Sequence, residues 1–182
     1  MAEALLIIDM QAEMQARLAA GRDHVNGDAP AVIEKMATHC RKAGIPVIHV
    51  RHRSDDPTSP FALGGAAAEP MPCDKAAPGE AVFEKTGSSA FAGTGLEAHL
   101  RRHGITSLMV TGAVAGFCVN STIRAASDLG FRVTIIRDGV LGFDLPDAHL
   151  SARQIFDVTM ALLEADFAAA IDSADFLSAH AA

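Results

Sequence analysis

Three residues that could together hydrolyse an acyl bond follow apolar segments of this 182-residue chain. Asp9 ends the first of these segments, Lys85 follows the third, and a glycine-containing turn after the fourth leads to Cys118. A cysteine attacks as its thiolate, which a nearby ammonium group or a helix N-terminus would stabilise. A carboxylate within hydrogen-bond reach could take the thiol proton and return it to a leaving amine. The three residues are therefore candidate catalytic groups of a cysteine hydrolase.

Each of these residues also has an ordinary structural interpretation. Asp9 could cap a helix that begins just after it. Lys85 could be a solvated surface lysine, and Cys118 could be a small buried apolar residue. The other two cysteines, Cys40 and Cys73, lie in a predicted helix and in an irregular segment, so neither follows a strand-to-helix turn. The residue types and spacing alone leave these interpretations open.

The apolar segments alternate with segments of helical periodicity, a pattern typical of an α/β protein. Strands are expected at residues 4–9, 45–51, 81–84, 106–112, 131–137 and 167–171. Helices are expected at residues 30–43, 95–103, 118–129 and 147–166. Near-continuous apolar strands separated by helices predict a doubly wound parallel sheet in a three-layer α/β/α fold, within one domain spanning residues 1–182.

Ligands of open parallel sheets bind beyond the carboxyl ends of the strands, where the three candidates would meet. The second strand ends in basic residues, of which His49 is expected to be buried. Arg51, His52 and Arg53 are expected to be solvated, with contact to a substrate as the alternative. Residues 52–79 are rich in Pro, Gly and Ala and show little periodicity. Such a long segment either forms a pocket wall or lid or is a surface insertion.

Composition excludes several classes of protein. A formal net charge of −7 argues against a nucleic-acid or anionic membrane surface. No apolar run approaches the ~20 residues of a membrane span, and no basic region precedes the first apolar run as in a signal peptide. Three cysteines without a CxxC pair predict neither a disulfide framework nor a zinc site, and they favour a reducing cytoplasm.

Three segments resemble the isochorismatase-like cysteine hydrolases: LLIIDMQ at residues 5–11, EKTGSSAF at 84–91 and VTGAVAGFCVNSTIRAASDLGF at 110–131. The resemblance implies a catalytic triad of Asp9, Lys85 and Cys118, no cofactor, and a homodimer or homotetramer. It also implies a six-stranded parallel sheet, for which we expect the spatial order 3-2-1-4-5-6. A non-proline cis peptide is implied at Ala113–Val114, which would aim the Val114 N–H, together with the Cys118 N–H, at an oxyanion.

The resemblance also narrows the chemistry. Isochorismate hydrolases act on a vinyl ether and resemble this pattern without the cysteine, so Cys118 favours amide hydrolysis. Nicotinamidases carry an Asp-x-His…His metal site after the second strand, and HVRHRSDDP at residues 49–57 lacks that spacing, so no metal is expected.

The leading prediction is hydrolysis of the C–N bond of a small-molecule amide or carbamoyl compound through a thioester. Gln11, Phe91 and Phe117 are the candidate pocket residues. Two alternatives stay open at this point, namely hydrolysis of an ester or vinyl ether, and a binding or scaffold protein that has kept the fold without catalysis.

Overall fold

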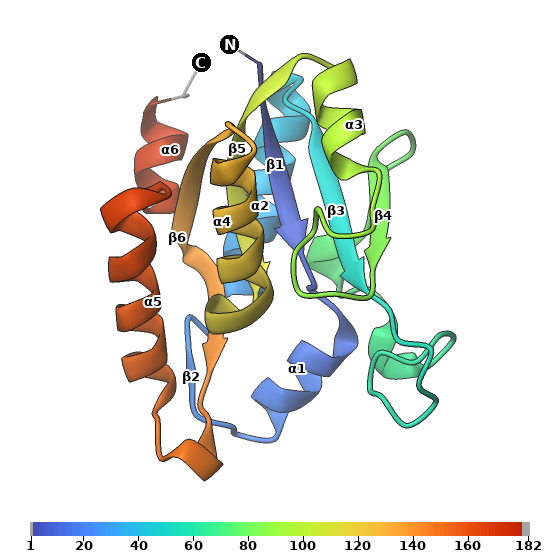
Figure 1. The fold of residues 1–182 in the computed structure, drawn as a ribbon, viewed down its shortest axis with the longest axis vertical. Helices are drawn as coiled ribbons and strands as arrows, with labels where there is room; N and C mark the ends of the chain where they lie inside the picture. The colour runs from blue at the N-terminus through green and yellow to red at the C-terminus, as the bar shows by residue number, and fades with distance from the viewer. Residues whose placement is uncertain (1, 180–182) are drawn as a thin grey trace.

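The computed structural model describes residues 2–179, and its central sheet lies between two layers of helices (Figure 1). The strands that match the predicted ones are β1 (Ala2–Ile8), β3 (Val47–His52), β4 (Ala81–Lys85), β5 (Ile105–Ala113), β6 (Arg132–Phe143) and β7 (Ala169–Ile171). They pair in parallel in the order β4-β3-β1-β5-β6-β7. This is 3-2-1-4-5-6 in chain order, so the predicted fold and strand order are confirmed.

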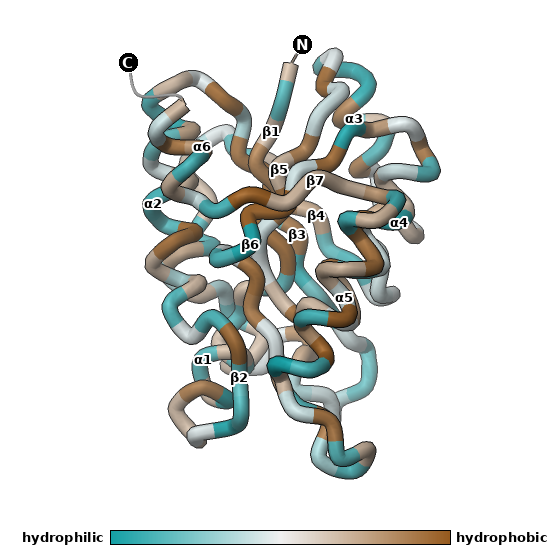
Figure 2. The backbone as a smooth tube through the Cα atoms, turned by 90° about the vertical axis from the view of Figure 1, so that its left-hand side faces the viewer, coloured by the Kyte–Doolittle hydropathy of each residue, from teal (hydrophilic) through white to brown (hydrophobic). Residues whose placement is uncertain are grey.

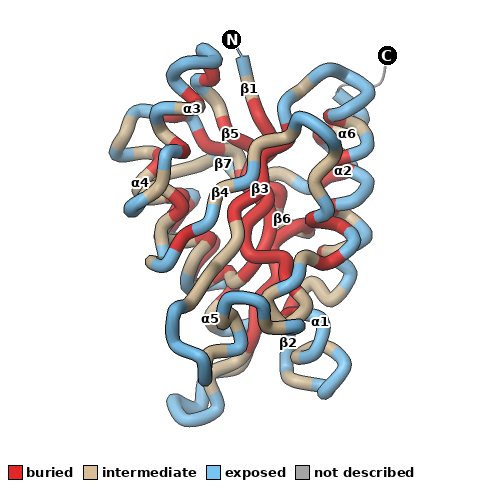
Figure 3. The backbone as a smooth tube through the Cα atoms, turned by 90° about the vertical axis from the view of Figure 1, so that its right-hand side faces the viewer, coloured by how far each residue is buried: buried red, intermediate tan, exposed pale blue. Residues whose placement is uncertain are grey.

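The alternating side chains of β1 explain why helices cover both faces of the sheet. Leu6 and Ile8 belong to the hydrophobic core on one face, whereas Leu5 and Ile7 belong to the core on the other. The first core is closed by α3 (Leu96–Arg102), α4 (Asn120–Asp128) and α5 (Ala152–Asp166), and the second by α2 (Ala29–Ala43) and α6 (Ser173–Ala179). Hydrophobic stretches follow the central strands in Figure 2, and Figure 3 shows the same strands buried between helices that are only partly exposed.

Several elements differ from the sequence-based expectation. The helix expected from residue 118 is preceded by a π-helical turn, Ala115–Val119, so α4 itself begins at Asn120. The helix expected from residue 147 begins at Ala152, because Ser151 caps it through a reciprocal capping box with Gln154. Two elements were not predicted, namely α1 (Ala12–Ala19) and the two-residue β2 (His24–Val25), which pairs antiparallel with β6.

Strand β6 continues to Phe143 instead of ending near residue 137. The register of β5 against β6 shifts between Val110 and Gly112, and pairing resumes at Gly112 with Val140. The irregularity accommodates Asp138 and Gly139, which interrupt the apolar pattern and predict a strand end from sequence.

In residues 2–179, no helix combines the length and the apolar character needed to cross a membrane.

A partly buried ionic network attaches the long segment between β3 and β4 to the sheet. His49 Nδ1 lies 2.6 Å from Asp74 Oδ1, and His49 Nε2 lies 3.0 Å from Glu80 Oε2. Arg51 donates to the other carboxylate oxygen of Asp74, and Arg41 donates to both oxygens of Glu80. His49 is therefore buried as predicted, while the expectation that Arg51 is solvated is wrong, because it pairs with a fully buried carboxylate.

The pH dependence of stability should reflect this network through Glu80. Burial alone would raise the pKa of its carboxyl group, but hydrogen bonds from Arg41, the Ala77 N–H and His49 lower it to about 2 from the ordinary 4.5. Because the folded pKa is the lower one, the stabilisation is present above about pH 4.5 and is lost as the pH falls toward 2. We expect Glu80→Gln to lower the free energy of unfolding by about 1–2 kcal/mol at neutral pH, a value discounted for solvent screening. The free energy of unfolding, measured in urea, should then fall less steeply with decreasing pH than in the unmodified protein. Glu97→Gln, which removes an exposed i,i+4 ion pair on α3, should lose unfolding free energy at acid pH as steeply as the unmodified protein does.

Candidate active site

The carboxyl ends of β1, β4 and β5 meet at one edge of the sheet and carry the three candidate residues. Asp9 follows β1 directly, its N–H donates to Val50 O, and its φ of 52° turns the chain away from the strand. Lys85 is the last residue of β4, and Cys118 lies in the π-helical turn that follows β5. The topology thus brings together an acid, an ammonium group and a thiol that lie far apart in the sequence.

The Lys85 ammonium group is the centre of this cluster. Its Nζ lies 2.7 Å from Asp9 Oδ2 and 3.3 Å from Cys118 Sγ. It also lies 3.2 Å from Gly87 O and 3.3 Å from His52 Nδ1. The side chain of Lys85 has no exposed surface, so the surface-lysine interpretation is wrong. Asp9 does not cap α1 either, because its carboxylate pairs with Lys85.

The electrostatics of the cluster favour a neutral thiol at rest. Burial, followed by the negative charge of Asp9, raises the pKa of Cys118 to about 12, which outweighs the opposing effect of Lys85. Burial also raises the pKa of Asp9, against the opposing charge of Lys85. In the described chain, Asp9 Oδ1 is buried without a hydrogen-bond partner, and Cys118 Sγ lies within 4.8 Å of an Asp9 oxygen. The carboxylate therefore offers an acceptor for the thiol proton.

His52 belongs to the site, so the expectation that it is solvated is wrong. Burial, and then the charge of Lys85, lower its pKa, so the neutral ring accepts from Lys85 through Nδ1. One oxygen of Asp9, one nitrogen of His52 and Cys118 Sγ lie within 4.8 Å of one another, as the ligands of a metal ion would. The Lys85 ammonium group contacts all three residues, and its positive charge would repel a metal cation. This donor set therefore fits an ammonium group and does not fit a metal ion.

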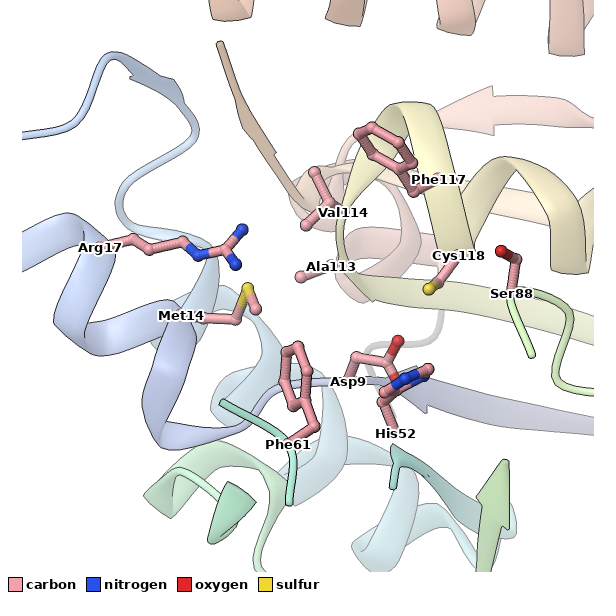
Figure 4. Close-up of a pocket in the computed structure, with 10 residues that line it drawn as sticks. All are labelled: Asp9, Met14, Arg17, His52, Phe61, Ser88, Ala113, Val114, Phe117 and Cys118. Carbon is pink, nitrogen blue, oxygen red and sulfur yellow. The ribbon is translucent and has the colours of Figure 1, made fainter. Parts of the chain in front are cut away.

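A cavity of about 260 Å³ opens beside the cluster (Figure 4). Its lining comes from the end of β1, from α1, from the end of β3 and the long segment after it, and from the turns at the ends of β4 and β5: Asp9, Met14, Arg17, His52, Phe61, Ser88, Ala113, Val114, Phe117 and Cys118. Most of the wall is apolar, with polar groups gathered around Cys118 and at Arg17. The Ala113–Val114 peptide is cis, as the family resemblance implies, and both residues line the cavity next to Phe117.

The three candidate pocket residues lie in different places. Phe117 lines the cavity and is half exposed at its mouth. Gln11 lies behind the wall, where its amide bonds to both backbone groups of His52 and to Ala68 O. Phe91 is not among the residues that line this cavity, because its ring stacks on Phe131 against the core, with centroids 5.9 Å apart.

Sequence reasoning missed the opposite wall of the cavity. Met14 and Arg17 come from α1, which the apolar pattern did not predict as an element. Phe61 comes from the long segment without periodicity, part of which does form a pocket wall. Within that segment, the one usable signal is an isolated aromatic residue in a run of small and polar ones.

Comparisons with known proteins agree with this architecture. The sequence-family model of the isochorismatase domain matches residues 3–172 of this chain. The isochorismatase family protein YrdC of Bacillus subtilis is 31% identical over 189 residues, covering 98% of both chains. A crystal structure of an isochorismatase-family protein from Chromobacterium violaceum is 34% identical, with a TM-score of 0.91 and coverage of 98% of this chain and 93% of that one. Nicotinamidase 3 of Arabidopsis thaliana is 26% identical over 185 residues, covering 93% of this chain and 84% of its own.

Proposed function

Because the chain belongs to the isochorismatase family of hydrolases, we propose that it hydrolyses the C–N bond of a small amide or carbamoyl compound through a thioester on Cys118. One observation carries the proposal: Lys85 Nζ contacts both Asp9 and Cys118, while Asp9 Oδ1 is left as an acceptor at the cavity. A relative of similar length is named as an amidase, which supports the same bond class.

The first half of the reaction acylates the cysteine. Asp9 takes the thiol proton as Cys118 Sγ attacks the carbonyl carbon, and the nearby Lys85 ammonium group stabilises the developing thiolate. The backbone N–H groups of Val114 and Cys118 hold the resulting oxyanion. Asp9 then gives its proton to the nitrogen, the C–N bond breaks, and ammonia or an amine leaves the thioester behind.

The second half restores the enzyme. Water attacks the thioester carbon while Asp9 accepts one of its protons, and the oxyanion is held by the same two N–H groups. The C–S bond then breaks, the carboxylic acid product leaves, and the proton on Asp9 returns to Cys118. The high pKa of the resting thiol fits this scheme, because the proton moves only as the attack proceeds.

A panel of small amides and carbamoyl compounds, assayed for ammonia release, tests the proposal. We expect Cys118→Ala to lower kcat by roughly 10⁴-fold or more, as removal of a covalent nucleophile does elsewhere. Cys73→Ala is the matched control, because Cys73 is buried outside the cavity lining, and it should keep the activity. Full ammonia release by Cys118→Ala would overturn the thioester mechanism.

Product analysis separates the alternatives. Ester hydrolysis yields an acid without ammonia, and a binding or scaffold protein gives no turnover. Intact-mass detection of an acyl adduct that disappears in Cys118→Ala would exclude a purely binding role.

A further inference from the structure

Arg17 brings a positive charge to the cavity wall that lies across from Cys118 (Figure 4). Its side chain is 27% exposed and projects from α1. Of the described residues that line the cavity, Arg17 alone is an arginine or lysine. The proposed reaction at Cys118 does not use it, so its position calls for another role.

The guanidinium group is held in place along one edge. Its Nε donates to Glu13 Oε1 at 2.8 Å, one helical turn earlier, and its Cζ lies 5.7 Å from the centre of the buried Phe143 ring. In the part of the chain that the structure describes, the hydrogen bond to Glu13 uses Nε alone. Figure 4 shows the two terminal nitrogens of Arg17 directed toward the cavity. The group is thus oriented before any ligand arrives, with its two Nη groups available.

The surroundings of Arg17 suit a carboxylate. Met14, Ala113 and Val114 form apolar wall between it and Cys118 (Figure 4). The carboxylate of Asp9, at the other side, is already paired with Lys85. A planar guanidinium fork binds a carboxylate through two parallel hydrogen bonds, and low exposure strengthens them.

We propose that Arg17 binds a carboxylate at the end of the substrate remote from the scissile amide. The substrate class is then a short amido acid or N-carbamoyl acid, with an apolar stretch of a few carbons between its two polar ends. A cavity of about 260 Å³ is small for a ligand pocket, which limits the length of that stretch. This inference rests on the proposed amide hydrolysis and adds an anionic group to the proposed substrate.

Matched substrate pairs test the inference by ammonia release. Succinamate is compared with butanamide and glutaramate with pentanamide, since each neutral amide carries a methyl group where the acid carries its carboxylate. We expect kcat/KM to favour the amido acid of at least one pair by about tenfold or more. Arg17→Gln should reduce that preference by about 10- to 100-fold, the usual effect of a charge-assisted hydrogen bond.

Two further variants separate anion binding from a merely structural ion pair. Glu13→Gln breaks the same pair but keeps the guanidinium group, so it should retain the preference for the amido acid. Arg101→Gln removes a matched i,i+4 pair of 2.8 Å on α3, away from the cavity, and should leave the preference unchanged. Equal loss of preference in Glu13→Gln and Arg17→Gln would overturn the anion-binding role.

Calorimetry keeps this test independent of turnover. Binding of glutaramate and pentanamide is measured to Cys118→Ala protein, with and without Arg17→Gln. Tighter binding of glutaramate that Arg17→Gln abolishes supports the anion site, even if no amide in the panel releases ammonia and the proposed reaction fails. Absent binding of glutaramate, or binding equal to that of pentanamide, overturns the inference even if ammonia is released.

Discussion

Asp9→Asn should abolish turnover and at the same time make Cys118 more reactive toward alkylating reagents. Loss of the proton acceptor should lower kcat by roughly 10³- to 10⁴-fold, because the proposed reaction moves the thiol proton through the Asp9 carboxylate in both of its halves. The same carboxylate raises the pKa of the thiol to about 12 together with burial. Once its charge is removed, the buried Lys85 ammonium group has the Cys118 thiolate as its natural counterion, so the thiol pKa falls.

Iodoacetamide labelling of Cys118, followed by intact mass spectrometry, measures this reactivity. In the unmodified protein the labelling rate should rise with pH without reaching a plateau near neutrality, because the thiolate is a minor species well below pH 12. Each unit by which the pKa falls raises the thiolate fraction tenfold and lowers its nucleophilicity about threefold. We therefore expect Asp9→Asn to label several-fold faster at neutral pH.

Lys85→Met should change the labelling rate of Cys118 in the opposite direction. Lys85 lowers the thiol pKa, so its removal should slow labelling while also abolishing turnover. Cys40 and Cys73 serve as internal references, because burial raises the pKa of each thiol to about 12 and neither lines the cavity. Slower labelling in Asp9→Asn, in parallel with its lost turnover, would show that Asp9 maintains the thiolate instead of receiving its proton.

The sheet and the meeting of Asp9, Lys85 and Cys118 were predictable because both depend on strong local signals. Strands buried on both faces produce nearly continuous apolar runs, as in residues 4–9 and 106–112, and parallel strands place their carboxyl ends at one edge. Asp9, Lys85 and Cys118 stand at or just beyond such ends, so their meeting follows from the topology. The short β2 was missed because two residues cannot establish a periodic pattern.

The cavity walls were less predictable because they depend on where side chains point across long sequence separations. Phe91 is the last residue of the family-like segment 84–91, yet it packs against the core, while Phe61 in the irregular segment reaches the cavity. His52 ends β3 directly opposite Lys85, and this register is visible only once β3 and β4 are paired. The ionisation of Cys118 is set mainly by burial, which its position after a turn does not reveal.

Gly112→Ala should be among the most destabilising single-methyl changes in the chain. A Cβ atom at Gly112 would lie 2.1 Å from Ile8 O and 2.6 Å from Ile8 N, where β5 passes β1, and the φ of +117° is unfavourable for any other residue. Neither backbone can move without breaking the pairing of the two central strands. Backbone strain and overpacking together should cost about 3 kcal/mol or more.

Gly130→Ala is the matched control for this effect. Gly130 also has a positive φ, of +83°, but a Cβ atom there would meet nothing within 4 Å, so only the conformational cost of about 1–2 kcal/mol remains. Urea unfolding of both variants therefore separates backbone conformation from the contact with Ile8. Because Ile8 directly precedes Asp9, any Gly112→Ala protein that folds should also lose ammonia release, whereas Gly130→Ala should retain it. Equal destabilisation of the two variants would show that the approach of β5 to Ile8 is not a constraint on the fold or on the site.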